Sequence, residues 1–110
     1  MSLRTFNLTV DVTDQQLIRY YNYKHPLTGF IEVSGSFGGG ILSFDISISD
    51  GVVKNPWNDC NGNHLMFSEA ETVEFTLPVI NRNGAGAIIY ATLDGATSPD
   101  ITINILDNTG

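Results

Sequence analysis

The sequence predicts an all-β protein: a single antiparallel β-sandwich, Ig-like or jelly-roll, with six to eight strands. Three observations support this prediction. Apolar and polar residues alternate with a period of two in several segments, as in strands that bury one face. Dipeptides that favour tight reversals, such as Asp50-Gly51 and Asn61-Gly62, fall between these segments. The segments are short and closely spaced, which is typical of sandwiches and barrels.

Six segments are expected to form strands. The cleanest alternation is in residues 42–49, whereas residues 87–93 are almost uniformly apolar and predict a central strand. The strand that precedes Pro78 should end there or lie at a sheet edge, because proline has no amide hydrogen for a ladder. In chain order, the expected strands are residues 5–12, 31–37, 42–49, 72–77, 87–93 and 101–105.

Two stretches do not follow this pattern. Thr13 and Gln16 have the spacing of a helix capping box, so a short helix is one prediction for residues 13–21. The tyrosines at the end of the same stretch suit a strand equally well, and the two alternatives stay open. Residues 55–63 are polar and are expected to form a loop of about nine residues.

Length and charge limit the classes of function. A chain of 110 residues is expected to form one domain, residues 1–110, whose apolar fraction of 42% is enough for a core without metal or disulfide. Five Lys and Arg against twelve Asp and Glu give a net charge of −7, which excludes nucleic-acid binding through a basic face. The sequence shows no signal peptide and no apolar run of the roughly 20 residues that span a bilayer. We therefore expect no membrane partner and synthesis in a cytoplasm.

Residues 33–51 contain a glycine motif followed by an alternating strand. Gly35, Phe37 and the run Gly38-Gly39-Gly40 precede that strand, and Asp50-Gly51 follows it. This arrangement resembles small β-sandwich modules in the virions of tailed phages, which often close with a segment similar to residues 89–103. The two stretches cover about a third of the chain.

The glycines of this motif are expected to shape the backbone, since they lack the Cβ that hinders sharp reversals. The run of three glycines predicts a flexible hairpin connection between the second and third expected strands, and Gly51 predicts the next hairpin. The expected hairpin glycines are Gly35, Gly38, Gly39, Gly40 and Gly51.

The resemblance implies a structural role in a virion. A free-standing chain of this length looks most like a capsid decoration or cement protein, made in the host cytoplasm and bound to the outside of the head. Its partner would be the major capsid protein. The symmetry axes of a capsid imply a homo-dimer or homo-trimer. The resemblance implies no catalysis and no cofactor. The alternative is a receptor-binding or carbohydrate-binding module of a tail fibre.

Candidate metal ligands have weak spacing. Asp59, Asn61 and Asn63 resemble the start of a calcium loop, but the twelfth position, which should be an acid, is Ala70. A plain Asn-Gly turn is the better interpretation. Cys60, His64 and His25 supply three ligand types without a fourth, so we expect no zinc site.

Candidate catalytic groups also lack partners. A Cys60–His64 nucleophilic pair has no orienting acid that the sequence identifies. Acid pairs drawn from Glu69, Glu71 and Glu74, or from Asp45 and Asp50, are expected to be solvated on the polar faces of strands. The chain is therefore predicted not to be an enzyme.

Aromatic residues give the candidate binding site. Tyrosine and tryptophan offer a large contact area at low entropic cost, so they are common in protein interfaces, and they also stack on sugars. The expected partner interface is Tyr20, Tyr21, Tyr23, Trp57 and Asn58. The alternative is that one or two of these aromatic residues, Trp57 in particular, belong to the core.

Overall fold

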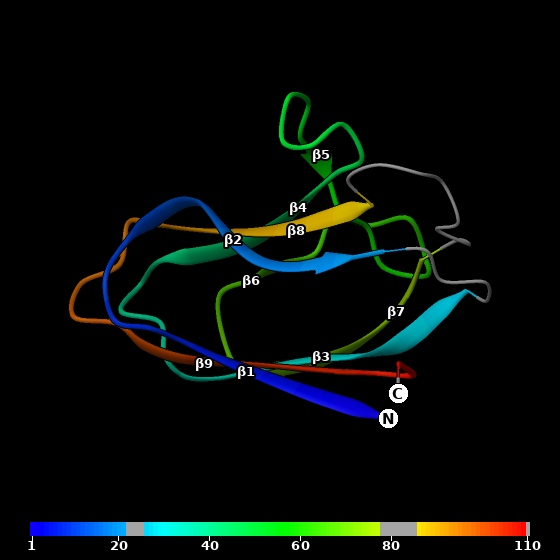
Figure 1. The fold of residues 1–110 in the computed structure, drawn as a ribbon. Coiled ribbons are helices and arrows are strands. Elements are labelled where there is room, and N and C mark those ends of the chain that lie inside the picture. Colours follow the sequence, from blue (N-terminus) through cyan, green and yellow to red (C-terminus); the bar gives the residue numbers. More distant parts are fainter. Residues whose placement is uncertain (22–25, 78–85, 110) are drawn as a thin grey trace.

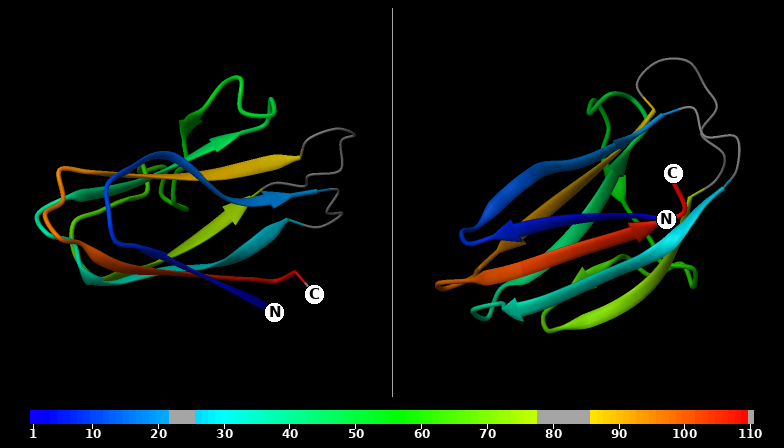
Figure 2. Two further views of the ribbon diagram at one scale, coloured as in Figure 1. Left: turned by 60° about the vertical axis from the view of Figure 1, so that its left-hand side comes forward. Right: turned by 60° about the horizontal axis from the view of Figure 1, so that its bottom comes forward.

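Two antiparallel sheets packed face to face make up the fold (Figures 1 and 2). The computed structural model describes residues 1–21, 26–77 and 86–109. Sheet 1 has the strand order β1 (Ser2–Leu8), β9 (Asp100–Asp107), β3 (Leu27–Ser36) and β7 (Glu71–Leu77). Sheet 2 has the order β2 (Val12–Tyr20), β8 (Ala87–Asp94), β4 (Ile41–Ser47) and β5 (Asn55–Pro56), and β6 (Met66–Phe67) also pairs with β4.

The β-sandwich prediction is confirmed, and the strand order is that of a jelly roll. Strand β5 pairs with Asp45 and Ile46 of β4, whereas β6 pairs with Leu42 and Ser43. The two short strands therefore act as one interrupted strand, which brings the number of strand positions in the described chain to eight. Counted this way, the sheet with strand order 1-8-3-6 faces the sheet with order 2-7-4-5, which is the order of a jelly roll. The chain changes sheet at every connection except the one between the fourth and fifth strands, which pair with each other.

The first two strands differ from the prediction. One strand was expected over residues 5–12, but β1 ends at Leu8 and β2 starts at Val12 in the other sheet. The chain crosses between the sheets here, and the Asp11 carboxylate accepts hydrogen bonds from the amides of Gly95 (3.2 Å) and Ala96 (3.1 Å). Residues 13–20 form a strand, so the helical alternative is wrong and the strand alternative is confirmed.

The glycine run does not form a hairpin. Strand β3 pairs with β7 and β9 in sheet 1, while β4 pairs with β8, β5 and β6 in sheet 2, so residues 37–40 connect the two sheets. Gly38 has a φ of +58°, and a Cβ there would lie 2.1 Å from the carbonyl oxygen of Thr97. The connection formed by residues 37–40, which we call the arch, needs glycine at position 38 because the backbone of Gly38 packs directly on the β8–β9 turn. Gly51, by contrast, does lie in the β4–β5 hairpin.

The other expected strands are confirmed with shifted ends. Strand β8 is central, between β2 and β4, and β7 is an edge strand that ends at Leu77. Strand β4 stops at Ser47, two residues before the expected end, and this places Ile48 in a loop. The largest fully buried side chains fill the space between the sheets: Tyr20, Phe44, Phe75, Ile31, Leu42, Ile89, Leu93, Ile101, Ile103, Ile105 and Val33.

Candidate functional site

The aromatic residues of the predicted interface that the structure describes do not lie together on the surface. Tyr20 is completely buried, and Trp57 is only 3% exposed, so the interface prediction is corrected for both. Tyr21 is half exposed. Asn58 is exposed and forms an isolated β-bridge with His64. Tyr23 lies outside the described residues.

Trp57 belongs to the core because its loop folds back under sheet 2. Its amide donates to the Phe44 carbonyl (3.1 Å), and its own carbonyl accepts from the Leu65 amide (2.8 Å). The indole ring meets the Phe75 ring edge-on, with centroids 5.0 Å apart and planes at 65°. The Phe44 ring lies 6.5 Å away on another side. Residues 57–65 thus form a small hairpin that Trp57 anchors between the two layers.

Tyr20 is part of a buried polar cluster at the end of the sandwich where both termini lie (Figure 1). Its hydroxyl donates to the Asp107 carboxylate (2.7 Å), which also forms an ion pair with Arg4 and accepts the backbone amide of Thr109 (3.0 Å). Burial acts to raise the pKa of Asp107. The hydrogen bonds from Thr109 and Tyr20, together with the charge of Arg4, outweigh it and lower the pKa below the ordinary value. The cluster is satisfied internally, which indicates a structural role.

The oxygen-bearing residues that were weighed as calcium ligands and set aside in favour of an Asn-Gly turn form hydrogen bonds within their own loop. The Asp59 carboxylate accepts the amides of Asn61 (2.8 Å) and Asn63 (3.0 Å), and Gly62 has a φ of +83°, as an Asn-Gly turn requires. Among the residues that the structure describes, no three His, Cys, Asp or Glu side chains are grouped as a metal site would need. His25 lies outside that set.

Cys60 and His64 contact different sheets. The Cys60 thiol lies near the backbone and side chain of Glu74 on β7. Desolvation, followed by the negative charges of Glu74 and Asp59, raises the pKa of this exposed thiol, which disfavours the nucleophilic thiolate. The His64 imidazole instead lies 2.9 Å from the Phe44 carbonyl and 3.4 Å from the Asp45 carboxylate, both on β4.

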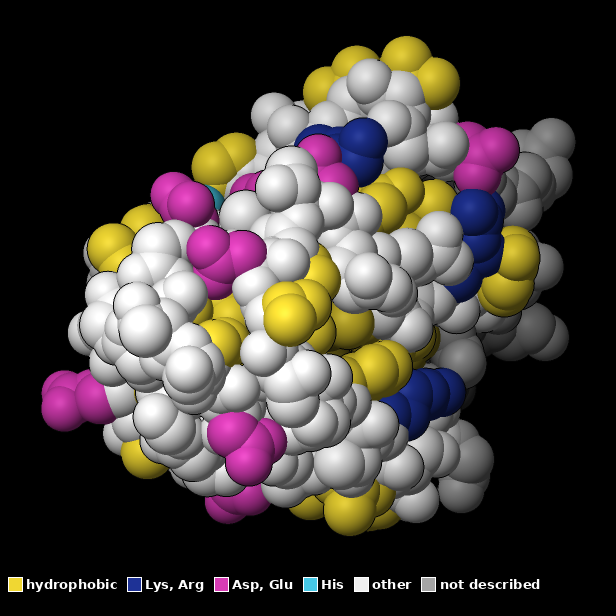
Figure 3. Space-filling view, turned by 90° about the vertical axis from the view of Figure 1, so that its left-hand side faces the viewer, with side chains coloured by type: hydrophobic (Ala, Val, Ile, Leu, Met, Phe, Trp, Pro, Cys, Tyr) yellow, Lys and Arg dark blue, Asp and Glu magenta, His cyan; other side chains and the backbone are white. Residues whose placement is uncertain are grey.

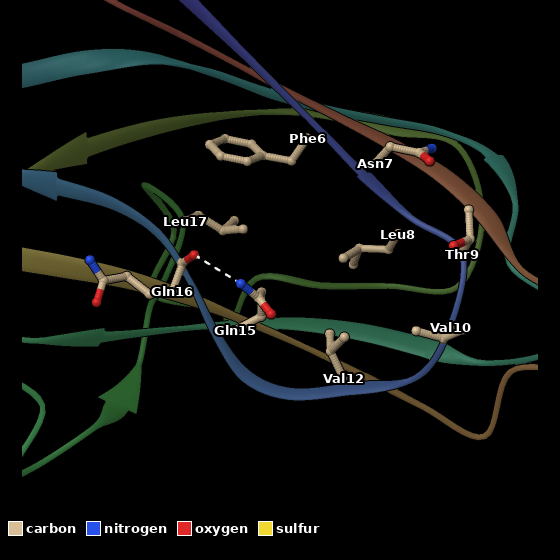
Figure 4. Close-up of a pocket in the computed structure, with 9 residues that line it drawn as sticks. All are labelled: Phe6, Asn7, Leu8, Thr9, Val10, Val12, Gln15, Gln16 and Leu17. Atoms are coloured by element: carbon tan, nitrogen blue, oxygen red, sulfur yellow. Dashed lines mark hydrogen bonds between the residues drawn. The ribbon is translucent and has the colours of Figure 1, made fainter.

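A groove of about 330 Å³ opens between the edge strands β1 and β2 (Figure 4). Phe6, Leu8, Val12 and Leu17 point into it, and polar residues form its rim. The described residues that line it include no ionisable side chain, so they offer no general acid or base. The groove is therefore a gap between the edge strands of the two sheets, where core side chains reach the surface.

The first surface with binding character is the β4–β5 loop, residues 48–54. Figure 1 shows this loop rising above sheet 2, on the side away from sheet 1. Ile48 is 82% exposed and Val52 83%, and Val53 is more than half exposed. We call these three side chains the loop tip. Exposed aliphatic side chains gathered in one protrusion are typical of contact surfaces.

Polar contacts hold the loop in one conformation. The buried Ser47 hydroxyl accepts the Gly51 amide (2.9 Å), and the Ser49 hydroxyl accepts the Val53 amide (2.9 Å). Two cationic side chains contact the base of the loop. The Arg19 guanidinium forms an ion pair with the Asp50 carboxylate (2.8 Å), and the Lys54 ammonium lies 5.1 Å from the centre of the Tyr90 ring. A fixed loop loses little entropy on binding, so the tip is preorganised for contact.

The second surface is the outer face of sheet 1. Leu3 and Phe30 both lie opposite Leu106 in the strand register, so the three side chains form a row across β1, β9 and β3. This apolar row borders a depression of about 300 Å³, whose other lining residues are Glu32, Thr72 and Asn104. In Figure 3, which keeps the vertical direction of Figure 1, hydrophobic side chains stand at both the top and the bottom margin of the molecule.

Comparisons with protein-family models, with curated proteins and with solved structures find no match to this chain. The described residues contain no helix that is long and apolar enough to cross a membrane.

Sequence reasoning missed both apolar surfaces. In the sequence, Ile48 continues the alternation of residues 42–49, which predicts an inward position in a strand. Val52 and Val53 follow a turn dipeptide without any periodic pattern. Phe30 comes just before the expected strand 31–37, which does not include it. Its place on the outer face could have been inferred from the alternation, because Ile31 and Val33 take the inward positions.

Proposed function

We propose that the chain is a non-enzymatic structural protein of a phage virion, of the decoration type, which links protein neighbours on the outside of a capsid shell. The observation that carries this proposal is the presence of exposed apolar surfaces on opposite layers of one small sandwich. A domain with two such surfaces can contact two neighbours at once and oppose their separation. That is the mechanical task of a cement protein.

Two further points support the proposal. Residues 33–51 carry the motif that resembles phage virion modules, and the glycine run within it lies in the arch, residues 37–40, which connects the two sheets. The jelly roll is also a common fold of viral capsid and lectin domains. This second point is an analogy of fold and supports a structural class, since one fold serves many functions.

The tail-fibre alternative receives less support. Sugar binding would use exposed aromatic rings as stacking surfaces, but Tyr20 and Trp57 are buried. Of the residues named for this role, Tyr21 and Asn58 are exposed in the described chain. Among the described residues, the apolar side chains with the largest exposed fractions, Val52 and Ile48, are aliphatic, and aliphatic side chains favour protein contacts over sugar stacking.

The proposal predicts that a major capsid protein gene lies beside the gene for this chain, and it is tested by binding to heads assembled from that capsid protein. We expect the chain to sediment with the heads at a fixed ratio and to raise the temperature at which they break. Replacing an exposed valine of the loop tip, Val52→Glu, should weaken binding by roughly tenfold or more. The matched control is Val10→Glu, since Val10 is also exposed but lies in the β1–β2 turn. Chain that stays in the supernatant at all concentrations would contradict the proposal.

A further inference from the structure

The two apolar surfaces have complementary shape and charge. The loop tip protrudes, whereas the apolar row of sheet 1 borders a depression. We propose that they bind each other in head-to-tail fashion: the β4–β5 loop of one copy inserts into the sheet 1 depression of a second copy. The contact makes a second copy of the chain one of the neighbours that a decoration protein would link, so the biological role of the contact rests on the proposed function. The contact itself requires no capsid.

Charge supports a second copy as the occupant. Two of the three Lys and Arg residues in the described chain, Arg19 and Lys54, lie at the base of the loop. Arg19 is paired with Asp50, whereas Lys54 interacts with the Gly51 carbonyl (3.0 Å) and the Tyr90 ring, so its positive charge is not balanced by these contacts. An acidic rim is therefore the fitting counterpart of the loop.

The outer face of sheet 1 provides such a rim. Glu32 lines the depression, where its carboxylate accepts a hydrogen bond from Asn104 (3.0 Å), and Glu74 lies opposite Phe30 at the end of the apolar row. Among the described residues, none that projects outward from the strands of sheet 1 is Lys or Arg. Insertion of the loop would place Lys54 near these carboxylates while the aliphatic tip covers the apolar row.

The same charges disfavour symmetric pairing. Two sheet 1 faces packed against each other would bring Glu32 and Glu74 of both copies together, and two loops would bring Lys54 near its equivalent. Like charges in a partly desolvated contact oppose association. A contact between different surfaces is heterologous, so it leaves one loop and one face free, and further copies add until the assembly closes into a ring or continues as a filament.

Complementary variants of the full-length chain test this contact in solution. Val52→Glu damages the loop tip, and Leu3→Glu damages the face at an exposed position on an edge strand. By analytical ultracentrifugation, the unaltered chain should form assemblies that grow with concentration. Each variant alone should associate roughly tenfold more weakly or worse, while Val10→Glu should behave as the unaltered chain. Circular dichroism and thermal unfolding verify that each variant is folded.

Mixing the two variants gives the decisive result. Each retains the surface that the other lacks, so an equimolar mixture should form one-to-one pairs that do not grow further. Added salt should weaken these pairs, because the charged groups around the contact are exposed. A monomeric unaltered chain, or a mixture without pairs, would overturn the inference.

The test also separates this inference from the proposed function. Copies that associate without binding heads would leave the contact standing and refute the decoration role. Chain that binds heads but stays monomeric at every concentration in free solution would refute the contact and leave the decoration role standing.

Discussion

Replacing Asp107 by Asn removes the one charge at the centre of the buried cluster that joins both ends of the chain. The Asp107 side chain is fully buried and interacts with Arg4, Tyr20 and Thr109. Asn keeps the size of the side chain but loses the negative charge and replaces one acceptor oxygen with a donor. The variant thus tests the electrostatic contribution with little change in packing.

The expected loss in the free energy of unfolding follows from how deeply each partner of the Asp107–Arg4 ion pair is buried. Breaking a buried pair by removing one partner lowers the free energy of unfolding by about 3–5 kcal/mol. The Arg4 side chain keeps 32% of its surface exposed, so water can solvate it in the variant, and Asn retains one acceptor. We therefore expect a loss of about 2–3 kcal/mol. With an unfolding entropy of about 2.1 cal/mol/K per residue, this lowers Tm by roughly 9–13 °C.

The pH dependence provides the second readout. Because the pKa of Asp107 is lower in the folded chain than in the unfolded chain, its carboxylate stabilises the fold above the unfolded pKa. That contribution is lost as the pH falls through the folded pKa. The difference in Tm between the unaltered chain and Asp107→Asn should therefore shrink as the pH is lowered from about 5 towards about 2.

Thermal unfolding by calorimetry, at several pH values in that range and at neutral pH, measures both effects. The control is Asp94→Asn at the exposed end of β8, which should change the free energy of unfolding by less than about 0.5 kcal/mol. An equal Tm for Asp107→Asn and the unaltered chain at neutral pH would refute the reasoning. So would a difference that does not change with pH.

Three further tests by denaturant unfolding separate the packing, backbone and contact roles of individual residues. Trp57→Ala should lower the free energy of unfolding by about 3–5 kcal/mol because the ring is buried between aromatic neighbours; an unchanged value would place Trp57 outside the core. Gly38→Ala should be clearly more destabilising than Gly39→Ala, since both have positive φ but only the first Cβ would meet backbone, at Thr97; equal losses would contradict this. Val52→Glu should leave the free energy of unfolding within about 0.5 kcal/mol, and a larger loss would show that the loop tip serves the fold.

Local patterns predicted the strands but not their partners. The alternation of Ile101, Ile103 and Ile105 matches their inward positions on β9, and the apolar run in β8 matches its central place. The glycine run looked like a hairpin because the strands on either side are adjacent in sequence. Pairing depends on contacts across the whole chain, and Gly38 packs on the distant Thr97, which no local pattern contains.

The residues of the buried polar cluster and of the loop tip are harder to predict than the strands, because they depart from the rule that inward positions are apolar and outward positions are polar. Asp107 occupies the next inward position after Ile105, so the alternation itself places an acid inside the sandwich. Such a position indicates a buried polar cluster, although its partners Arg4 and Tyr20 come from distant strands. In the structure, Ile48 does not take the inward strand position that the sequence alternation predicts. The Ser47 hydroxyl accepts the Ser49 (3.3 Å) and Gly51 amides and turns the chain out of the strand.

The loop that carries the tip is held by polar atoms, and this separates the requirements of folding from those of binding. The hydroxyls of Ser47 and Ser49 and the carboxylate of Asp50 fix its conformation, whereas the side chains of Ile48 and Val52 are over four-fifths exposed. Replacing both aliphatic side chains with Thr would keep the β-branched shape at each position. If the fold needed them, that double variant would lose stability. If they serve a contact, it would unfold as the unaltered chain does and lose association alone, which is the outcome the geometry predicts.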